Sequence, residues 1–262
     1  MNSEAMKSGK PLILVTNDDG LEAKGLKELV EVVRPLGRVV VVAPSESQSG
    51  MSHAITVKSP LRMKKMREEP DLLMYKCNGT PVDCVKLACN QLLKEKPFIL
   101  VSGINHGSNS STSVFYSGTI GATMEGCING IPSIGFSLLS IESDADFTAS
   151  KSIAGRIIMK VMKSGLPPSV CLNVNIPRGS LEEIKGVKVC RQNMGFWREE
   201  FEKRVDPAGR HYFWLTGHYH NSEPEAGDTD EWALRNHFVS VVPLQTDLTA
   251  HAAMDKIRKW NL

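Results

Sequence analysis

The stretch LILVTNDDG, residues 12–20, decides how this chain folds. Residues 12–16 form an apolar run that ends in Thr16, the pattern of a strand buried on both faces of a parallel sheet. The polar residues 17–20 stop the run. Apolar residues then recur at helical spacing, at Leu26, Leu29, Val30 and Val33. A buried strand followed by a polar loop and an amphipathic helix indicates an α/β protein.

The same alternation continues through the first two thirds of the chain. The pattern predicts buried strands at 38–43, 98–101, 132–136 and 170–175, a further strand at 53–57, and an exposed edge strand or hairpin at 61–67. It predicts helices that begin at Thr80-Pro81 and that span about 119–129 and 145–162. Strands that alternate with helices imply a mostly parallel sheet with helices on both faces.

The pattern changes after about Gly179. Aromatic residues crowd the range 191–215 on both sides of the turn Asp206-Pro207-Ala208-Gly209, and this arrangement predicts a long β-hairpin. A polar loop at 217–230, a strand at 237–244 and a closing helix at 249–260 are expected to follow.

Composition excludes several classes of protein. The 262 residues are 41% hydrophobic and 23% charged, with a formal net charge of +2 and dispersed basic residues, so stable nucleic-acid binding is not expected. No run approaches the roughly 18 apolar residues of a membrane helix, and residues 1–10 lack the apolar core of a secretory signal. Six scattered cysteines without a CxxC pair favour free thiols over disulfides or zinc ligands, which indicates a reducing, cytoplasmic location.

Three polar loops follow predicted strands, at the edge where open α/β sheets bind ligands. In the first, Asp18 and Asp19 place two carboxylates side by side, which favours a hard cation such as Mg²⁺ or Mn²⁺ between them. An Asx turn and helix cap, with Gly20 permitting the turn, is the other interpretation of this loop.

The second loop, residues 44–50, offers serine hydroxyls followed by Gly50, or is simply a flexible surface loop. In the third, Asn105 and Asn109 supply amide groups, and Ser117-Gly118-Thr119 precedes a helix whose free N–H groups favour a phosphate. Ser117 or Thr119 is equally suited to be the N-cap of that helix.

Other catalytic templates are absent from the sequence. It contains no GxxxxGK[ST] loop, no GxGxxG after the first strand, no GxSxG elbow and no HExxH pair. His218 and His220 alternate on an extended segment without a further His or Cys nearby, and they are expected to be exposed polar residues.

Taken together, the motifs resemble the SurE family in order and spacing. The resemblance covers nearly the whole chain from Pro11 onward. It rests on LVTNDDG at 14–20, VVAP at 41–44 leading to Ser49-Gly50, GTPVDCV at 79–85, VSGINHG at 101–107 and YSGT at 116–119, and on the later segments 172–177, 239–244 and 247–249.

The resemblance implies an activity and a site. The family hydrolyses phosphomonoesters with a divalent metal, usually 5′- or 3′-nucleoside monophosphates and sometimes short polyphosphate. By resemblance the metal, Mg²⁺ or Mn²⁺, is held by Asp18, Asp19, Ser49 and Asn105, with Asp18 and Asp19 as the catalytic residues. Phosphate contacts are expected at Asn17, Gly50, Asn109, Ser117, Gly118 and Thr119.

The resemblance also implies how the chain is organised. Residues 1–10 are expected to be a disordered extension, and residues 11–262 to form one SurE-like domain. Its Rossmann-like core is expected at about 11–178, and its C-terminal hairpin and helix, within 179–262, are expected to be exchanged between subunits of a homodimer or homotetramer.

Several alternatives stay open at this point. His106 stands where smaller residues are common in the family, and it is either a solvated loop residue or a substrate contact and proton donor. The attacking group is either a metal-activated water, which we favour, or an aspartate. The rivals in other classes are a non-catalytic nucleotide sensor of the same fold and a serine hydrolase that pairs Ser49 with His53 or His106.

Overall fold

The computed structural model describes residues 9–260, apart from the side chains of residues 199 and 200. The predicted N-terminal extension therefore lies outside the described residues except for Gly9 and Lys10. The strands of the main sheet are β1 (Leu12–Thr16), β2 (Arg38–Pro44), β3 (Met63–Glu69), β4 (Leu72–Cys77), β5 (Ile99–His106), β6 (Ser133–Leu138), β7 (Val170–Ile176), β8 (Val187–Val189) and β11 (Val239–Gln245).

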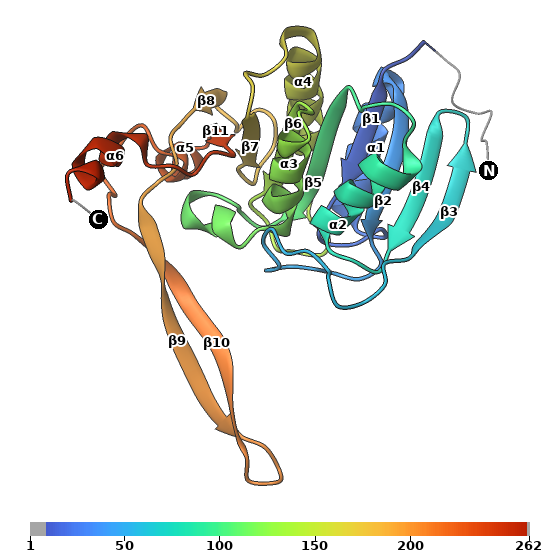
Figure 1. Ribbon diagram of the computed structural model, residues 1–262. Coiled ribbons are helices and arrows are strands. Elements are labelled where there is room, and N and C mark those ends of the chain that lie inside the picture. The colour runs from blue at the N-terminus through green and yellow to red at the C-terminus, as the bar shows by residue number, and fades with distance from the viewer. Residues whose placement is uncertain (1–8, 261–262) are drawn as a thin grey trace.

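The helices surround this sheet and its C-terminal edge (Figure 1). The longer ones are α1 (Lys24–Val33), α2 (Pro81–Leu87), α3 (Gly118–Ile128), α4 (Thr148–Ser164), α5 (Asp230–Arg235) and α6 (His251–Arg258), and the short turns are η2 (Arg34–Leu36), η3 (Ala88–Leu92) and η4 (Ser111–Phe115). Within the described residues, no helix is long and apolar enough to cross a membrane.

The sheet is mostly parallel. Its strand order is β3-β4-β2-β1-β5-β6-β7-β11-β8, with β4, β2, β1, β5, β6 and β7 parallel to their neighbours in that run. Only β3 on β4 and β11 on β7 pair in the antiparallel sense within the described sheet. The carboxyl ends of β1, β2 and β5 therefore meet at one edge, and the predicted α/β fold is confirmed.

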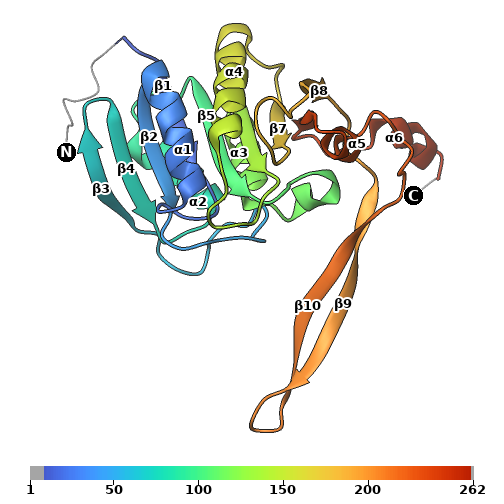
Figure 2. The same ribbon diagram turned by 180° about the vertical axis from the view of Figure 1, so that it is seen from behind.

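Two apolar layers hold the sheet between helices. On one face α1 and α4 pack over the central strands, and Leu26, Leu29 and Val33 are fully buried there. On the other face α2 and α3 cover the sheet through residues such as Val85 and Ala122 (Figure 2). Each fully buried Leu or Val side chain stabilises such a layer by about 1.5–3 kcal/mol.

Helix α1 approaches β5 unusually closely. A Cβ atom added to Gly25 would lie 2.0 Å from the carbonyl oxygen of Ile104, far inside van der Waals contact. Gly25 therefore lets the helix backbone rest directly on the strand, one residue before Asn105.

Several predicted boundaries were wrong. Residues 53–57 form a loop and not a strand, because the Thr56 N–H donates to Asp83 Oδ1 at 3.1 Å and the Ala54 carbonyl accepts from Thr80 Oγ1 at 2.8 Å. The strand expected to end at Val101 continues to His106. The strand β4 was not predicted at all, whereas β3 confirms the predicted edge strand.

The C-terminal third contains the predicted hairpin. Strands β9 (Gly195–Val205) and β10 (His211–Asn221) pair in the antiparallel sense along their whole length, and in both views the hairpin extends away from the rest of the molecule (Figures 1 and 2). It reaches further than the predicted range 191–215, so the loop expected to start at 217 starts later. Strands β8 and β11 from the same third join the main sheet.

Candidate active site

A cavity of about 340 Å³ opens at the carboxyl edge of the sheet. It brings together residues from loops that lie far apart in the sequence. Its lining residues are Asp18, Ser49, Gly50, Asn105, His106, Asn109, Ser113, Tyr116, Ser117, Trp197, Leu215 and Thr216. The volume lies within the range of small-molecule sites in proteins.

Asp18 is the carboxylate that lines this cavity, with 3% of its surface exposed, and Asp19 lies beside it outside the lining. Its Oδ1 accepts a hydrogen bond from the Thr119 hydroxyl at the start of α3. Burial raises the pKa of Asp18 to about 6, the Thr119 hydrogen bond opposes that rise, and the nearby charge of Asp19 adds to it. A buried carboxylate beside a second one is stabilised in its charged form by a cation.

Asp19 is half-buried and turns toward a different element. Its Oδ2 accepts from the backbone N–H of His106, at the end of β5, at 3.4 Å. Burial raises the pKa of Asp19, whereas the hydrogen bond and the charge of His106 lower it. The two carboxylates are thus held by two different walls of the site, α3 and β5.

Asn105 presents an oxygen to the cavity. Its Nδ2 donates to the carbonyl oxygens of His106 at 3.1 Å and Gly107 at 2.8 Å. Because both amide hydrogens are used by the backbone, Oδ1 is the atom left for a ligand.

Ser49 lies on the exposed loop after β2, and this loop is joined to the first. The Gln48 N–H donates to the carbonyl oxygen of Asp18 at 2.7 Å. The Ser49 hydroxyl lies 3.0 Å from that of Ser47.

This set of donors suits a hard cation. Two carboxylates, one amide oxygen and one hydroxyl are the ligand types that Mg²⁺ and Mn²⁺ prefer. Among the described side chains, no three of His, Cys, Asp or Glu gather as a metal cluster. The residues present therefore fit the metal that the sequence predicted.

Asn109 is fixed by a buried polar network from β6 and β7. Its N–H donates to Asn175 Oδ1, its Nδ2 donates to Ser137 Oγ, and its carbonyl accepts from Asn173 Nδ2, each at 2.8 Å. Three contacts on one residue leave its amide little freedom, so the position of this wall is set before any ligand arrives.

The remaining predicted phosphate contacts have different surroundings. Ser117 lines the cavity and is the N-cap of α3, since its Oγ accepts from the Ile120 N–H at 3.1 Å. Gly118 packs on Asp18, where an added Cβ would lie 2.8 Å from the Asp18 Cβ. Asn17 donates to the Gly20 carbonyl at 2.9 Å and shapes the first loop. Asn17, Gly118 and Thr119 are buried behind the lining residues.

The histidines of the site have distinct partners. His106 is not a solvated loop residue: it ends β5, lines the cavity, and packs edge-on against Phe147 with ring centroids 5.1 Å apart. His53 Nε2 lies 3.0 Å from Glu125 Oε2 on α3. Since His53 is paired with Glu125, and the described residues show no hydrogen bond from Ser49 to His53 or His106, the geometry does not favour a serine hydrolase.

Sequence reasoning missed the wall that the hairpin contributes. Trp197 lines the cavity from near the start of β9, Leu215 and Thr216 line it from the middle of β10, and Ser113 and Tyr116 line it from the segment before α3. The aromatic density of 191–215 was the available signal, but it was interpreted only as a surface for a second subunit.

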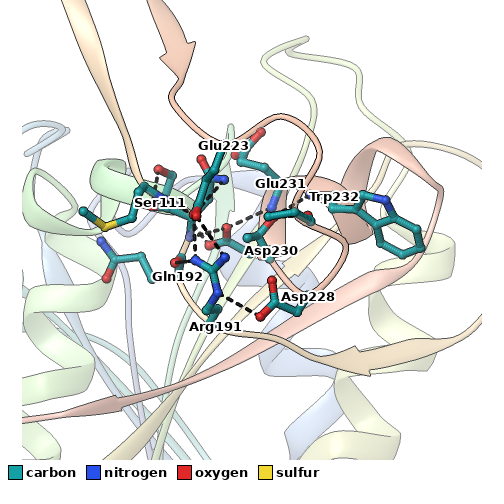
Figure 3. A network of polar contacts seen from close by, with 12 residues as sticks. Ser111, Arg191, Gln192, Glu223, Asp228, Asp230, Glu231 and Trp232 are labelled. Atoms are coloured by element: carbon teal, nitrogen blue, oxygen red, sulfur yellow. Dashed lines mark hydrogen bonds and ion pairs between the residues drawn. The ribbon is translucent and has the colours of Figure 1, made fainter.

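A dense polar network joins the residues that flank the hairpin to Ser111 in η4 (Figure 3). The buried Asp230 carboxylate accepts from the backbone N–H groups of Ser111 at 2.8 Å and Asn193 at 2.9 Å. Arg191 pairs with Glu223 at 2.6 Å and with Asp228 at 2.9 Å. Burial raises the pKa of Asp230, and its backbone hydrogen bonds oppose that rise.

Fold and site together define an α/β protein with an oxygen-rich, acidic cavity at the carboxyl edge of a mostly parallel sheet. The family model described as "Survival protein SurE" matches residues 13–199, and the chain belongs to the SurE family.

Related proteins agree over the full length. The 5′-nucleotidase SurE of Flavobacterium psychrophilum is 52% identical over 254 residues, covering 97% of this chain and 98% of the relative. That of Flavobacterium johnsoniae is 53% identical over 258 residues, covering 98% and 99%. The crystal structure of the SurE protein from Aquifex aeolicus superposes with a TM-score of 0.83 at 40% identity, covering 96% of this chain and all of that one.

Proposed function

We propose that the protein is a divalent-metal-dependent 5′-nucleotidase that hydrolyses nucleoside monophosphates to nucleoside and phosphate. The observation that carries this proposal is the convergence of Asp18, Ser49 and Asn105 in one cavity, with Asp19 bonded to the adjacent residue of β5. The relatives from the two Flavobacterium species, at 52% and 53% identity, are named 5′-nucleotidase SurE, which supports the same substrate class.

Asp18, Asp19, Ser49 and Asn105 would hold the metal, which when bound neutralises negative charge on the phosphoryl group and makes a water more acidic. Thr119 orients Asp18 through its hydroxyl. Asp19 is the more exposed of the two carboxylates, and it accepts the proton of the attacking water. An aspartate fully engaged in holding a cation is a poor nucleophile, so water is the preferred attacking group.

The phosphate and the nucleoside would occupy different parts of the cavity. Gly50, Asn109 and Ser117 lie beside the carboxylates and are placed to contact phosphoryl oxygens, and α3 directs its N-terminus at the same place. Tyr116 and Trp197 add flat aromatic surface on which a base can pack. This aromatic wall supports nucleotides over simple phosphate esters.

The hairpin supports a proposed homodimer or tetramer. Phe201, Phe213 and Leu215 share one face of the hairpin and are 57–64% exposed in the single chain. An apolar face of this kind on a projecting ribbon is suited to cover a second copy.

The six cysteines are all unpaired, which supports a reducing location.

The site is tested with Asp19→Ala. Hydrolysis of p-nitrophenyl phosphate and of a panel of 5′- and 3′-nucleotides is measured with Mg²⁺, with Mn²⁺ and with EDTA. Loss of about 10³-fold or more in kcat is expected, because charge stabilisation and proton acceptance both go. Full activity in a folded Asp19→Ala protein, or full activity of the parent protein in EDTA, would refute the proposal. Absence of turnover by the purified parent protein would instead favour the non-catalytic sensor.

A further inference from the structure

The loop that carries Ser49 has little support of its own. We call residues 45–56, which follow β2, the β2 loop. Residues 49–51 within it are exposed, and a Cβ added to Gly50 would meet no atom within 4 Å. Gly50 and Ser52 both have positive φ, 78° and 54°. Such a backbone is not held in place by local preference, so its position depends on contacts elsewhere.

One such contact lies before Ser49, where the Gln48 N–H donates to the Asp18 carbonyl at 2.7 Å, and the others lie on its C-terminal side. The Ser52 N–H donates to the Tyr116 carbonyl at 3.1 Å, and the Ser52 hydroxyl donates to the Phe115 carbonyl at 2.6 Å. Helix α3 also presses on this part of the loop, since a Cβ added to Gly121 would lie 2.3 Å from the Ser52 carbonyl oxygen. The loop therefore lies directly on the helix whose N-terminus faces the cavity.

One side chain of the β2 loop reaches into that helix. His53 Nε2 lies 3.0 Å from Glu125 Oε2, and Glu125 is 5% exposed. Lys86 at 3.1 Å and Asn129 at 3.0 Å contact the other carboxylate oxygen. These partners, with His53 first, lower the pKa of Glu125 to about 2. A buried carboxylate that stays charged is a strong and permanent hydrogen-bond acceptor.

We propose that His53 is a positioning residue: through its hydrogen bond to Glu125 it holds the β2 loop on α3 and so keeps Ser49 and Gly50 at the cavity. The inference rests on the proposed function, because it assigns Ser49 a part in holding the metal. His53 itself acts on no reacting atom. Its role corresponds to that of the outer contacts that orient metal ligands in other proteins.

The other contacts of the β2 loop do not substitute for the hydrogen bond between His53 and Glu125. Ser52 is held through its own backbone and hydroxyl, and Thr56 through Asp83 on α2. Among these anchors, His53 adds the side-chain bond to the body of α3. Lys86 shares the carboxylate of Glu125 but belongs to α2, so it provides a control that touches the same acceptor and leaves the loop alone.

The test compares His53→Ala, His53→Gln and Lys86→Met. Mn²⁺ binding is measured by calorimetry without substrate, backbone hydrogen exchange is followed for residues 47–54, and kcat and KM are measured over a range of Mn²⁺. For His53→Ala we expect Mn²⁺ affinity to fall about tenfold, as for other lost outer contacts, with faster exchange in the loop and kcat at saturating Mn²⁺ nearly retained. His53→Gln, which keeps an N–H donor, should recover most of both losses, and Lys86→Met should resemble the parent.

The outcomes separate the two proposals. Unchanged Mn²⁺ affinity and unchanged loop exchange in His53→Ala would overturn the positioning role. If the parent protein bound no Mn²⁺, the proposed function would fail, and the exchange of residues 47–54 would still decide whether His53 holds the loop. Should His53→Ala not fold, Glu125→Gln, which keeps a side-chain oxygen but loses the charge, is measured in the same way.

Discussion

The cavity and the hairpin differ in what covers their side chains. In the cavity, polar groups such as Asp18 and Asn109 are 3% and 6% exposed, and their partners come from the same chain. On the hairpin, Phe213 and Trp214 are 57% and 58% exposed, and the strands pair only with each other. A two-stranded ribbon with exposed aromatic residues is marginal alone. The polar groups of the cavity are thus satisfied within one chain, whereas the apolar ribbon leaves its aromatic residues exposed, as the proposed contact with a second copy requires.

The strongest test of the cavity is Asp18→Asn. We expect activity to fall by about 10³-fold or more, since the change removes a carboxylate proposed to hold the metal that neutralises the phosphoryl group. In EDTA, where no metal is bound, Asp18→Asn should have a higher free energy of unfolding than the parent protein. Burial raises the pKa of Asp18 to about 6, so the folded state of the parent loses stability as pH rises from about 4 through 6.

That loss of stability is worth about 3 kcal/mol above pH 6 and is absent below the unfolded pKa. Urea unfolding of both proteins between pH 4 and 8 checks it. Parallel stability curves for Asp18→Asn and the parent would contradict a buried, charge-strained Asp18.

The hairpin is tested by replacing Phe201 and Phe213 together with Ser. The two side chains share a face, and burying each against a partner contributes about 1.5–3 kcal/mol. Self-association should weaken at least about 100-fold, because 1.4 kcal/mol corresponds to a factor of ten. Sedimentation velocity measures it, with Glu202→Gln on the opposite face as the control. A parent protein that is monomeric at all concentrations would show that the ribbon has another purpose.

A third change weakens the cavity wall without touching its lining. Asn175→Ala removes the acceptor of the Asn109 N–H and of the Ser108 hydroxyl. An unpartnered buried N–H costs about 1–3 kcal/mol of unfolding free energy, and the KM for nucleotide should rise. Asn90→Ala, which removes an exposed bond to the Lys86 carbonyl, is the matched control and should leave both quantities unchanged.

Glu125, the carboxylate behind the β2 loop, should make the stability of the fold depend on pH with the opposite sign to Asp18. The pKa of Glu125 is lowered to about 2, so its charged form stabilises the fold above about pH 4.5, and this contribution is lost as pH falls through 2. Glu125→Gln should lower the unfolding free energy by about 1–2 kcal/mol at pH 6, and the difference should shrink below pH 4.5. A constant difference from pH 6 to pH 3 would argue against the ionised state of Glu125.

The smallest effect belongs to the tip of the hairpin. Arg210 Nε lies 2.8 Å from Asp206 Oδ2 in an exposed turn. Exposed pairs of this kind contribute little to stability, so Arg210→Ala should leave the urea midpoint unchanged. A loss as large as that of Asn175→Ala would mean that the tip is covered in the assembled protein.

The sequence predicted the long apolar strands and the polar edge strand β3, and it missed β4 and the short strand β8. Residues 12–16 and 38–43 are almost continuous apolar runs and are buried, so the sequence pattern and the observed burial agree. Strand β4 contains Tyr75 and Lys76 and pairs with β2 from far along the chain, which no local pattern reveals. Residues 53–57 imitate a strand, yet Ile55 and Val57 are 51% and 76% exposed.

The residues of the site also fall into those that the sequence could predict and those that it could not. Residues at strand ends could be predicted, because parallel topology alone brings them to one edge. Two facts depended on tertiary structure: Thr119 donates to a carboxylate 101 residues away, and Trp197 returns from the hairpin to the cavity. Metal binding, phosphate contacts and subunit exchange remain predictions.

The contact of α1 with β5 has a consequence for anyone who edits this protein. Residue 25 faces no ligand, but a methyl group there would collide with the Ile104 carbonyl oxygen and push the backbone that presents Asn105. A survey by alanine replacement would then score Gly25 as though it took part in the chemistry. Libraries that aim to change substrate preference should leave this glycine untouched.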